Sequence, residues 1–176
     1  NNPILFSVSN LGKTTNKVDQ LDGLVVDTIN ILESYAVVIT REDINNYDSA
    51  KRIWVSDDGL NFQEAHFHTQ ASNISYYSTL KEIDGRIFAT LCTQKRGFFE
   101  KDGYENYVSD STGFIFTRAA PLIPKREGWP EFTTIDSLKG TIIQKFETDK
   151  SLFQKREIYT KISLDNGKSW SNLRIK

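Results

Sequence analysis

The chain has little of several features that would define other classes of protein. Cys92 is its only cysteine, so no disulfide can close within the chain, and His66 and His68 have no cysteine near them with which to form a zinc cluster. No apolar run approaches the about 18 residues of a membrane span. The net charge of −1 argues against a nucleic acid or an anionic membrane surface as the main partner. We therefore expect no metal, no other cofactor and no nucleic acid.

The remaining composition is that of a globular domain. Hydrophobic residues make up 38% and aromatic residues 12% of the 176 positions, enough for an apolar core. The first ten residues, NNPILFSVSN, lack the basic front and apolar stretch of a secretory signal, so we expect any such signal upstream of this segment. Asn73 begins an Asn-Ile-Ser sequon and is the predicted N-glycosylation site.

One short motif, SLDNGKSW at residues 163–170, predicts a self-contained turn. Asp-Asn-Gly after an extended segment is a hairpin signal, and Gly167 can adopt the positive φ that a tight turn requires. The Asp165 carboxylate can accept hydrogen bonds from the turn amides, and Ser163 can brace the turn from the preceding strand. Trp170 can bury its ring against the base of the hairpin. We call this arrangement a stapled turn and predict a structural role for it.

The same spacing recurs upstream. VSDDGLNF and SDSTGFIF keep most of the motif, with Val55 at the serine position of the first and Ser111 at the aspartate position of the second. The residues that these two segments retain are Asp57, Gly59, Phe62, Ser109, Gly113 and Phe116. A weaker match at residues 8–15 keeps Gly12, and the four glycines stand 47, 54 and 54 residues apart. This near-constant period indicates a repeated structural unit.

A second pattern repeats in step with the first. The segments ILESYAVVI, EIDGRIFAT and SLKGTIIQK each read as strand, tight turn and strand, with Ser34, Gly85 and Gly140 in the turns. Each is followed by a third strand, a stapled turn and a fourth strand, which makes a four-stranded antiparallel unit of about 50 residues. Such a unit is typical of a propeller blade.

The predicted fold is accordingly all-β, a segment of a β-propeller with stapled turns. The predicted boundaries are the end of one blade at residues 1–20 and three blades at residues 21–70, 71–125 and 126–176. Closed propellers usually have about four to eight blades, so we expect these three to belong to a larger ring. The first strand of each blade is expected to line the central channel.

The stapled turns match the Asp-box motif, S-x-D-x-G-x-x-[FW], of sialidases and several other propellers. The longer segments KRIWVSDDGLNFQEAHF, SYYSTLKEIDGRIFATL and YTKISLDNGKSWSNLR resemble the propeller of the sortilin-type receptors, above all the fungal vacuolar protein sorting receptors. The resemblance runs over about residues 20–176 and departs from the Asp-box motif at Val8, Thr15, Val55 and Ser111.

The resemblance to sortilin-type receptors implies a non-catalytic, cargo-binding protein of the Golgi and endosome lumen. Family members have a ten-bladed propeller, a cysteine-rich module and one transmembrane helix, and the last two would lie outside this segment. Their cargo includes hydrolase propeptides, and peptide cargo can bind inside the channel. By that resemblance, Tyr76, Tyr77 and Ser78, on a predicted channel strand, are candidate cargo contacts.

Two further features leave alternatives open. Phe98 and Phe99 are adjacent in a long predicted loop with basic neighbours, so they suit either protein recognition or packing on the next blade. His66 and His68 are two positions apart, so both are expected on one face of a strand. There they could form a weak metal site or a pH sensor, or simply be part of a solvated surface.

A sialidase-like glycoside hydrolase is the alternative function. Such an enzyme needs two carboxylates across one cleft. The staple carboxylates stand one to a blade and are not expected to converge.

Overall fold

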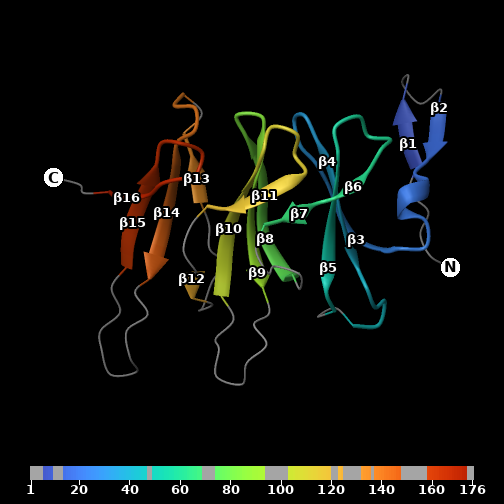
Figure 1. Ribbon diagram of the computed structural model, residues 1–176, viewed down its shortest axis with the longest axis horizontal. Coiled ribbons are helices and arrows are strands. Elements are labelled where there is room, and N and C mark those ends of the chain that lie inside the picture. Colours follow the sequence, from blue (N-terminus) through green and yellow to red (C-terminus); the bar gives the residue numbers. More distant parts are fainter. Residues whose placement is uncertain are drawn as a thin grey trace.

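The computed structural model describes residues 6–9, 14–46, 49–68, 74–93, 103–119, 123–124, 132–135, 137–147 and 158–173. Three four-stranded antiparallel units follow one another along the chain, after a two-stranded hairpin and a short 3-10 helix (Figure 1). The hairpin and the helix comprise β1 Phe6–Ser9, β2 Thr14–Lys17 and η2 Asp19–Leu21. The described residues thus confirm the prediction of an all-β fold built from repeated four-stranded units.

The three units have the same strand order, and each lies inside one predicted blade. The first comprises β3 Val25–Ile31, β4 Ala36–Arg41, β5 Lys51–Ser56 and β6 Gln63–Glu64. The second comprises β8 Ile74–Ile83, β9 Arg86–Thr93, β10 Gly103–Ser109 and β11 Ile115–Arg118, with β12 Ile123–Pro124 beside β10. The third comprises β13 Phe132–Thr134, β14 Ile142–Glu147, β15 Ile158–Ser163 and β16 Ser171–Asn172.

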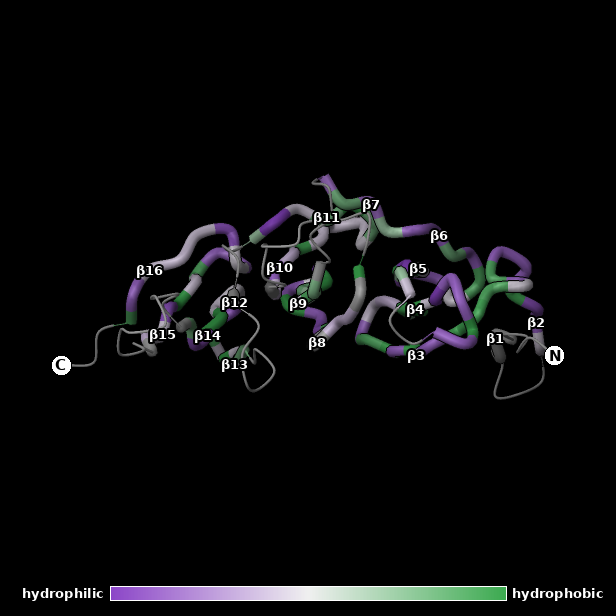
Figure 2. The backbone as a smooth tube through the Cα atoms, turned by 90° about the horizontal axis from the view of Figure 1, so that it is seen from below, coloured by the Kyte–Doolittle hydropathy of each residue, from purple (hydrophilic) through white to green (hydrophobic). Residues whose placement is uncertain are grey.

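The units stand side by side like blades. Figure 2 shows the first strands, β3, β8 and β13, along one side of the row and the fourth strands, β6, β11 and β16, along the other. The second strands are covered on both faces, which is why β4 and β9 read as nearly continuous apolar runs. In β4, for example, Val37, Val38 and Ile39 are all fully buried.

Apolar clusters fill the spaces between neighbouring units. Between the first and second units, Val37 and Ile39 of β4 meet Ile87, Ala89 and Leu91 of β9. Between the second and third units, two clusters are separated by a polar layer. One contains Phe88, Val108 and Ile142, and the other contains Cys92, Tyr104 and Phe146.

The polar layer joins the second and third units by hydrogen bonds. Thr90 Oγ1 donates to Asn106 Oδ1 over 2.8 Å, and Asn106 Nδ2 donates to Gln144 Oε1. All three residues are buried, while the nitrogen of the Gln144 amide has no hydrogen-bond partner. A fully buried amide pair of this kind contributes only when both partners are present, because removal of one leaves the other unsatisfied.

The predicted fourth strand of the first unit is divided between two units. Gln63–Glu64 stays with β5, but β7 His66–Phe67 pairs in parallel with β11 of the next unit. The backbone N–H groups of His66 and His68 donate to the Phe114 and Phe116 oxygens over 2.8 and 3.2 Å. The chain therefore crosses to the next unit before that unit's first strand begins.

Candidate functional site

The stapled turn after β15 is held by a serine and a carboxylate. Ser163 Oγ donates to Asp165 Oδ1 over 2.8 Å and accepts the Gly167 N–H over 2.8 Å. The Ser169 hydroxyl and N–H donate to the same carboxylate over 2.6 and 2.8 Å. These bonds, led by that of the Ser169 hydroxyl, hold the pKa of Asp165 below its usual range.

The turn after β5 uses a different aspartate from the one that the sequence comparison assigned. The acceptor is Asp58, not Asp57: Asp58 Oδ1 takes the N–H groups of Leu60 and Asn61 over 2.7 Å each. Ser56 fills the serine position that alignment on the glycine gave to Val55, since its Oγ accepts the Gly59 N–H over 2.8 Å. The correction has a simple cause, because Gly59 stands three positions after Ser56, whereas Gly167 stands four positions after Ser163.

In the turn after β10 the carboxylate also stands one position from the predicted one. Ser109 Oγ accepts the Ile87 N–H over 2.8 Å. Asp110, rather than Ser111, supplies the side-chain acceptor and takes the Thr112 hydroxyl over 2.7 Å. Partial burial pushes the pKa of Asp110 upward, but the hydrogen bonds from Thr112 and neighbouring amides outweigh it and leave the pKa below its usual range.

The aromatic residues after the turns pack on the preceding unit. Phe62 joins Val18 and Leu21, which precede the first unit, and Phe116 lies in the cluster between the first and second units. Trp170 Nε1 donates to the Ala119 oxygen at the end of the second unit over 2.8 Å. The motif therefore joins neighbouring units as well as closing its own turn.

Two turn glycines are also points of close approach. Gly113 has a φ of +82°, and a Cβ there would lie 2.6 Å from Cε1 of Tyr35. Gly167 has the same φ, and a Cβ would lie 2.7 Å from Cε2 of Phe88. Each glycine thus faces an aromatic ring of the preceding unit, and both its φ and the space around it exclude a side chain.

The staple carboxylates are not arranged as an active site. Asp58, Asp110 and Asp165 belong to three different units, and each accepts hydrogen bonds from its own turn. Among the described residues, no group of three or more His, Cys, Asp and Glu side chains could hold a metal ion. The same part of the chain contains no helix long and apolar enough to cross a membrane.

The candidate cargo residues lie partly outside the described structure. Tyr76 and Tyr77 are half-buried on β8 and pack toward opposite sides, Tyr76 on the Cys92 cluster and Tyr77 on the Val37 cluster. Ser78 lies on β8 with an undescribed side chain. Phe98, Phe99 and Asn73 lie outside the described residues.

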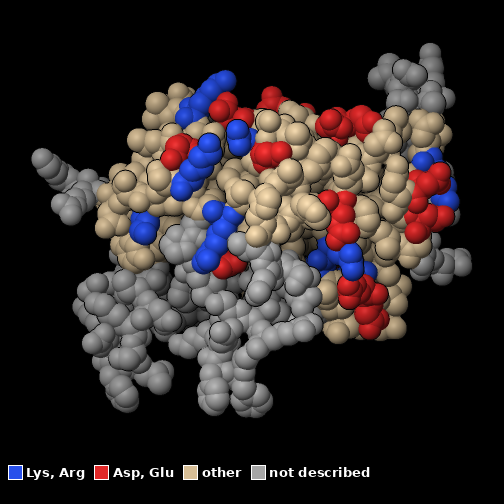
Figure 3. Space-filling view, in the orientation of Figure 1, with Lys and Arg blue, Asp and Glu red and all other residues tan. Residues whose placement is uncertain are grey.

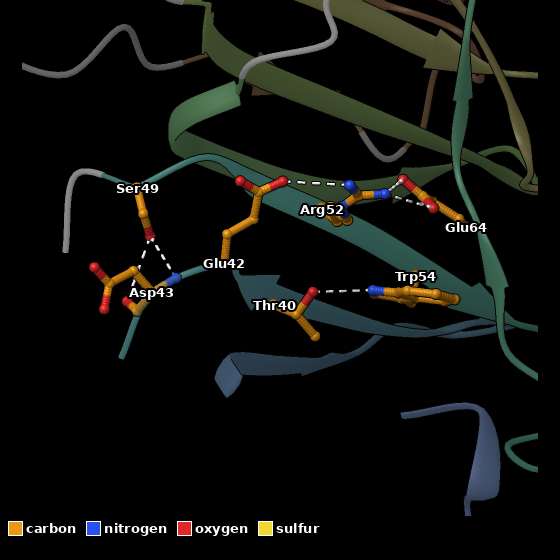
Figure 4. A network of polar contacts seen from close by, with 7 residues as sticks. All are labelled: Thr40, Glu42, Asp43, Ser49, Arg52, Trp54 and Glu64. Atoms are coloured by element: carbon orange, nitrogen blue, oxygen red, sulfur yellow. Dashed lines mark hydrogen bonds and ion pairs between the residues drawn. The ribbon is translucent and has the colours of Figure 1, made fainter. Parts of the chain in front are cut away.

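A charged network covers the outer part of the first unit (Figure 4). Arg52 donates to both oxygens of Glu64 over 3.1 and 3.2 Å and to Glu42 over 3.2 Å. Beside it, a hollow of about 300 Å³ is lined by these three residues together with His66 and Phe67. Because the Arg52 side chain is half exposed, this network is expected to add little to stability.

The geometry identifies the class of protein first. The chain consists of consecutive propeller blades, and their turns carry Asp-box-like staples. Solved structures agree on the fold. The β-propeller domain of the Trilobed protease from Pyrococcus furiosus matches with a TM-score of 0.53 at 10% identity, over 98% of this chain and 53% of that one. An α-L-arabinofuranosidase from Fusarium graminearum matches with a TM-score of 0.51 at 15% identity, over 81% of this chain and 45% of that one.

The sequence relatives are more specific. The family model described as "Sortilin, neurotensin receptor 3" matches residues 1–176, and the chain belongs to this Sortilin-Vps10 family. It is 31% identical to the vacuolar protein sorting/targeting protein 10 of Zygosaccharomyces rouxii, over 98% of this chain and 11% of that protein. It is also 31% identical to an uncharacterized membrane glycoprotein of Saccharomyces cerevisiae, over 93% of this chain and 40% of that protein. The resemblance stated from the sequence is confirmed, and the chain spans well under half the length of these relatives.

Proposed function

We propose that the chain forms consecutive blades of a ten-bladed lumenal propeller in a vacuolar sorting receptor. The receptor would bind soluble hydrolases or their propeptides in the Golgi and carry them to the endosome. The observation that carries this proposal is the family match over all 176 residues, together with about 30% identity to named vacuolar sorting proteins. The remaining blades, a cysteine-rich module and a transmembrane helix would belong to the rest of the protein.

A non-catalytic role is supported by how the carboxylates of the turns are used. Each accepts hydrogen bonds from its own turn, which holds its pKa low and keeps it ionised, whereas a general acid needs a raised pKa. The arabinofuranosidase likeness, at 15% identity, concerns the fold and not the chemistry.

The cargo contacts remain those proposed from the sequence. Tyr76, Tyr77 and Ser78 lie on β8, a first strand, and Phe98 and Phe99 complete the set. The packing of both tyrosines on neighbouring clusters leaves only part of each ring for cargo. Asn73 is the proposed glycosylation site, which fits a protein of the secretory pathway.

The proposal is tested with the full-length protein. Purified receptor is mixed with a vacuolar hydrolase in its precursor and mature forms, and binding is measured at neutral pH. We expect saturable binding of the precursor and much weaker binding of the mature form. A protein that binds neither form but hydrolyses a fluorogenic sialoside or arabinofuranoside would overturn the receptor proposal and establish the glycosidase alternative.

A further inference from the structure

The stapled turn of the third unit contains the only Asn-Gly pair in the sequence, Asn166 and Gly167. An asparagine followed by glycine is chemically labile, because glycine has no side chain to hinder attack of its backbone nitrogen on the preceding Cγ. The turn lies at the top of the third unit in Figure 1, and Figure 3 shows charged side chains of both signs over this part of the surface. The labile pair is therefore close to solvent, and the turn itself must decide whether it reacts.

The reaction to which such a pair is prone is deamidation through a cyclic imide. Hydroxide removes the proton of the Gly167 N–H, and the nitrogen forms a bond to Cγ of Asn166. The bond from Cγ to Nδ2 breaks, and the leaving nitrogen takes a proton from water and departs as ammonia, which regenerates hydroxide. Water then opens the imide at either carbonyl and gives aspartate or isoaspartate. The reaction consumes one water molecule and needs no oxidant or reductant.

The closed turn blocks the first step of this reaction. Gly167 is buried, and its N–H donates to Ser163 Oγ over 2.8 Å. Hydroxide reaches a buried, hydrogen-bonded N–H only when the hydrogen bond opens. The hydrogen bond to Ser163 therefore protects the proton whose loss would begin the reaction.

The amide that would be attacked is restrained as well. The backbone N–H of Asn166 donates to the Gly140 oxygen over 3.0 Å, in the connection between β13 and β14. Its side-chain Oδ1 and Cγ lie 3.3 and 3.4 Å from the position that a Cβ of Gly140 would occupy. The side chain of Asn166 thus packs on the bare backbone of a second turn, and its Cγ can rotate toward the Gly167 nitrogen only by giving up this contact.

We propose that Asn166 is a latent deamidation site, which is protected while the stapled turn is closed and reacts when the turn opens. Ser163 is the protecting residue, because it holds the Gly167 N–H. This assigns to the repeated serine of the motif a chemical role in addition to its structural one. The inference is independent of what the protein binds.

Deamidation would prevent the turn from closing again. Isoaspartate adds one carbon atom to the backbone just before Gly167, so the spacing that places its N–H on Ser163 is lost. Either product also adds a carboxylate next to that of Asp165, and like charges at adjacent positions repel. Trp170 attaches the third unit to the second from this same turn. Reaction at one asparagine would therefore weaken the junction between two units.

The experiment follows deamidation in the full-length protein at mildly alkaline pH, either folded in buffer or unfolded in urea. Trypsin cleavage after Lys161 and Lys168 releases residues 162–168, which contain Asn166. The mass of this peptide reports deamidation, and labelling by protein isoaspartyl methyltransferase reports isoaspartate. We expect the reaction to be more than about tenfold slower in the folded protein than in urea, because at least one hydrogen bond must first break.

Asn172 provides an internal control. It lies in the next tryptic peptide, residues 169–174, and is exposed but followed by leucine. In urea it should react much more slowly than Asn166, since the leucine side chain hinders attack. If exposure alone governed the reaction, Asn172 would be the more reactive of the two in the folded protein.

Two serine variants of the same turn test the protecting role. Ser163→Ala removes the acceptor of the Gly167 N–H and should speed deamidation of the folded protein about tenfold. Ser169→Ala removes a hydroxyl that donates to Asp165 over 2.6 Å but leaves the Gly167 N–H on Ser163. It should have a smaller effect. Both variants should react like the unaltered protein in urea.

Each arm of the experiment can overturn part of the proposal. If Asn166 does not react in urea, it is not a deamidation site. Equal rates in buffer and in urea for the unaltered protein would show that the closed turn gives no protection. Equal rates in the two folded serine variants would show that Ser163 is not the protecting residue. Circular dichroism establishes that each variant is folded, and if Ser163→Ala does not fold, the comparison of buffer with urea in the unaltered protein still decides the proposal.

Discussion

Trp170 Nε1 donates a hydrogen bond over 2.8 Å to the carbonyl oxygen of Ala119, 51 residues earlier, and another over 3.0 Å to that of Gly167 in its own turn. A single indole therefore closes a turn and attaches one unit to the preceding one. Its ring packs on both apolar clusters between the second and third units. The centroid of the ring lies 5.6 Å from the centroid of the Phe146 ring. The repeated motif thus contributes to the joining of units.

Replacement of Trp170 should separate these two contributions. We expect Trp170→Ala to lower the free energy of unfolding by about 3–5 kcal/mol, because the ring leaves a cavity between two units. Trp170→Phe keeps much of the packing and loses the single indole N–H that the two carbonyl oxygens share, at a cost of about 1 kcal/mol. Urea unfolding of the intact protein, monitored by a signal from the propeller, measures the loss of stability in each variant. If Trp170→Ala leaves stability unchanged, the indole does not join the units.

Gly113 and Gly23 form a matched pair for the cost of close packing. Both have positive φ, +82° and +79°, but a Cβ on Gly23 would meet nothing within 4 Å, whereas one on Gly113 would clash with the Tyr35 ring. Gly23→Ala should cost only the backbone strain, about 1–2 kcal/mol. Gly113→Ala should cost more, since the ring must also move. If thermal unfolding shows equal losses of stability in the two variants, the Tyr35 ring moves at no measurable cost. Only the positive φ would then require glycine at position 113.

The polar layer between the second and third units can be compared with its apolar counterpart. By strand register, Thr90 and Asn106 occupy the level of Ile39 and Ile53 in the first unit. Gln144→Leu should destabilise by about 1–3 kcal/mol, because it leaves the Asn106 amide buried without its partner.

A control follows from the same comparison. The triple variant Thr90→Ile, Asn106→Ile and Gln144→Ala copies the apolar layer of the first interface, where Ile39, Ile53 and Ala89 belong to one buried cluster. It should recover stability relative to Gln144→Leu, since no polar group is left without a partner. If the triple variant is the less stable of the two, the layer contributes through the shape of its side chains and not through hydrogen bonds.

The stapled turns predict a particular dependence of stability on pH. The pKa values of Asp58, Asp110 and Asp165 lie below the usual 3.8, so the folded state favours their ionised forms. Their contribution is fully present above the unfolded-state pKa and is lost as pH falls from about 4 through the lowered folded-state values. Stability should therefore change little on their account between pH 7 and 5 and fall below about pH 4.

A pair of neighbouring aspartates tests this assignment. Asp58→Asn should reduce the loss of stability below about pH 4, whereas Asp57→Asn keeps the hydrogen bonds to the Asp58 carboxylate and should therefore retain that loss. Thermal unfolding of each variant from pH 3 to pH 7 gives the comparison. The assignment of Asp58 would be wrong if the two variants exchanged these behaviours.

The sequence by itself determined the repeating unit, because its signals are local. Turn glycines at 59, 113 and 167, alternating and apolar strands, and a serine or aspartate beside each turn act within a few residues of chain, so an all-β fold of four-stranded units followed from them. The receptor family came from the resemblance of longer segments to the sortilin-type receptors, not from these patterns. Tertiary structure decided what depends on neighbours. It selected Asp58 over Asp57, because register with β4 fixes where β5 ends and shortens the turn by one residue. Tertiary structure also decided that Trp170 donates to Ala119 and that residues 63–67 are divided between two units. These contacts form only when the units pack together, and no local sequence pattern encodes them.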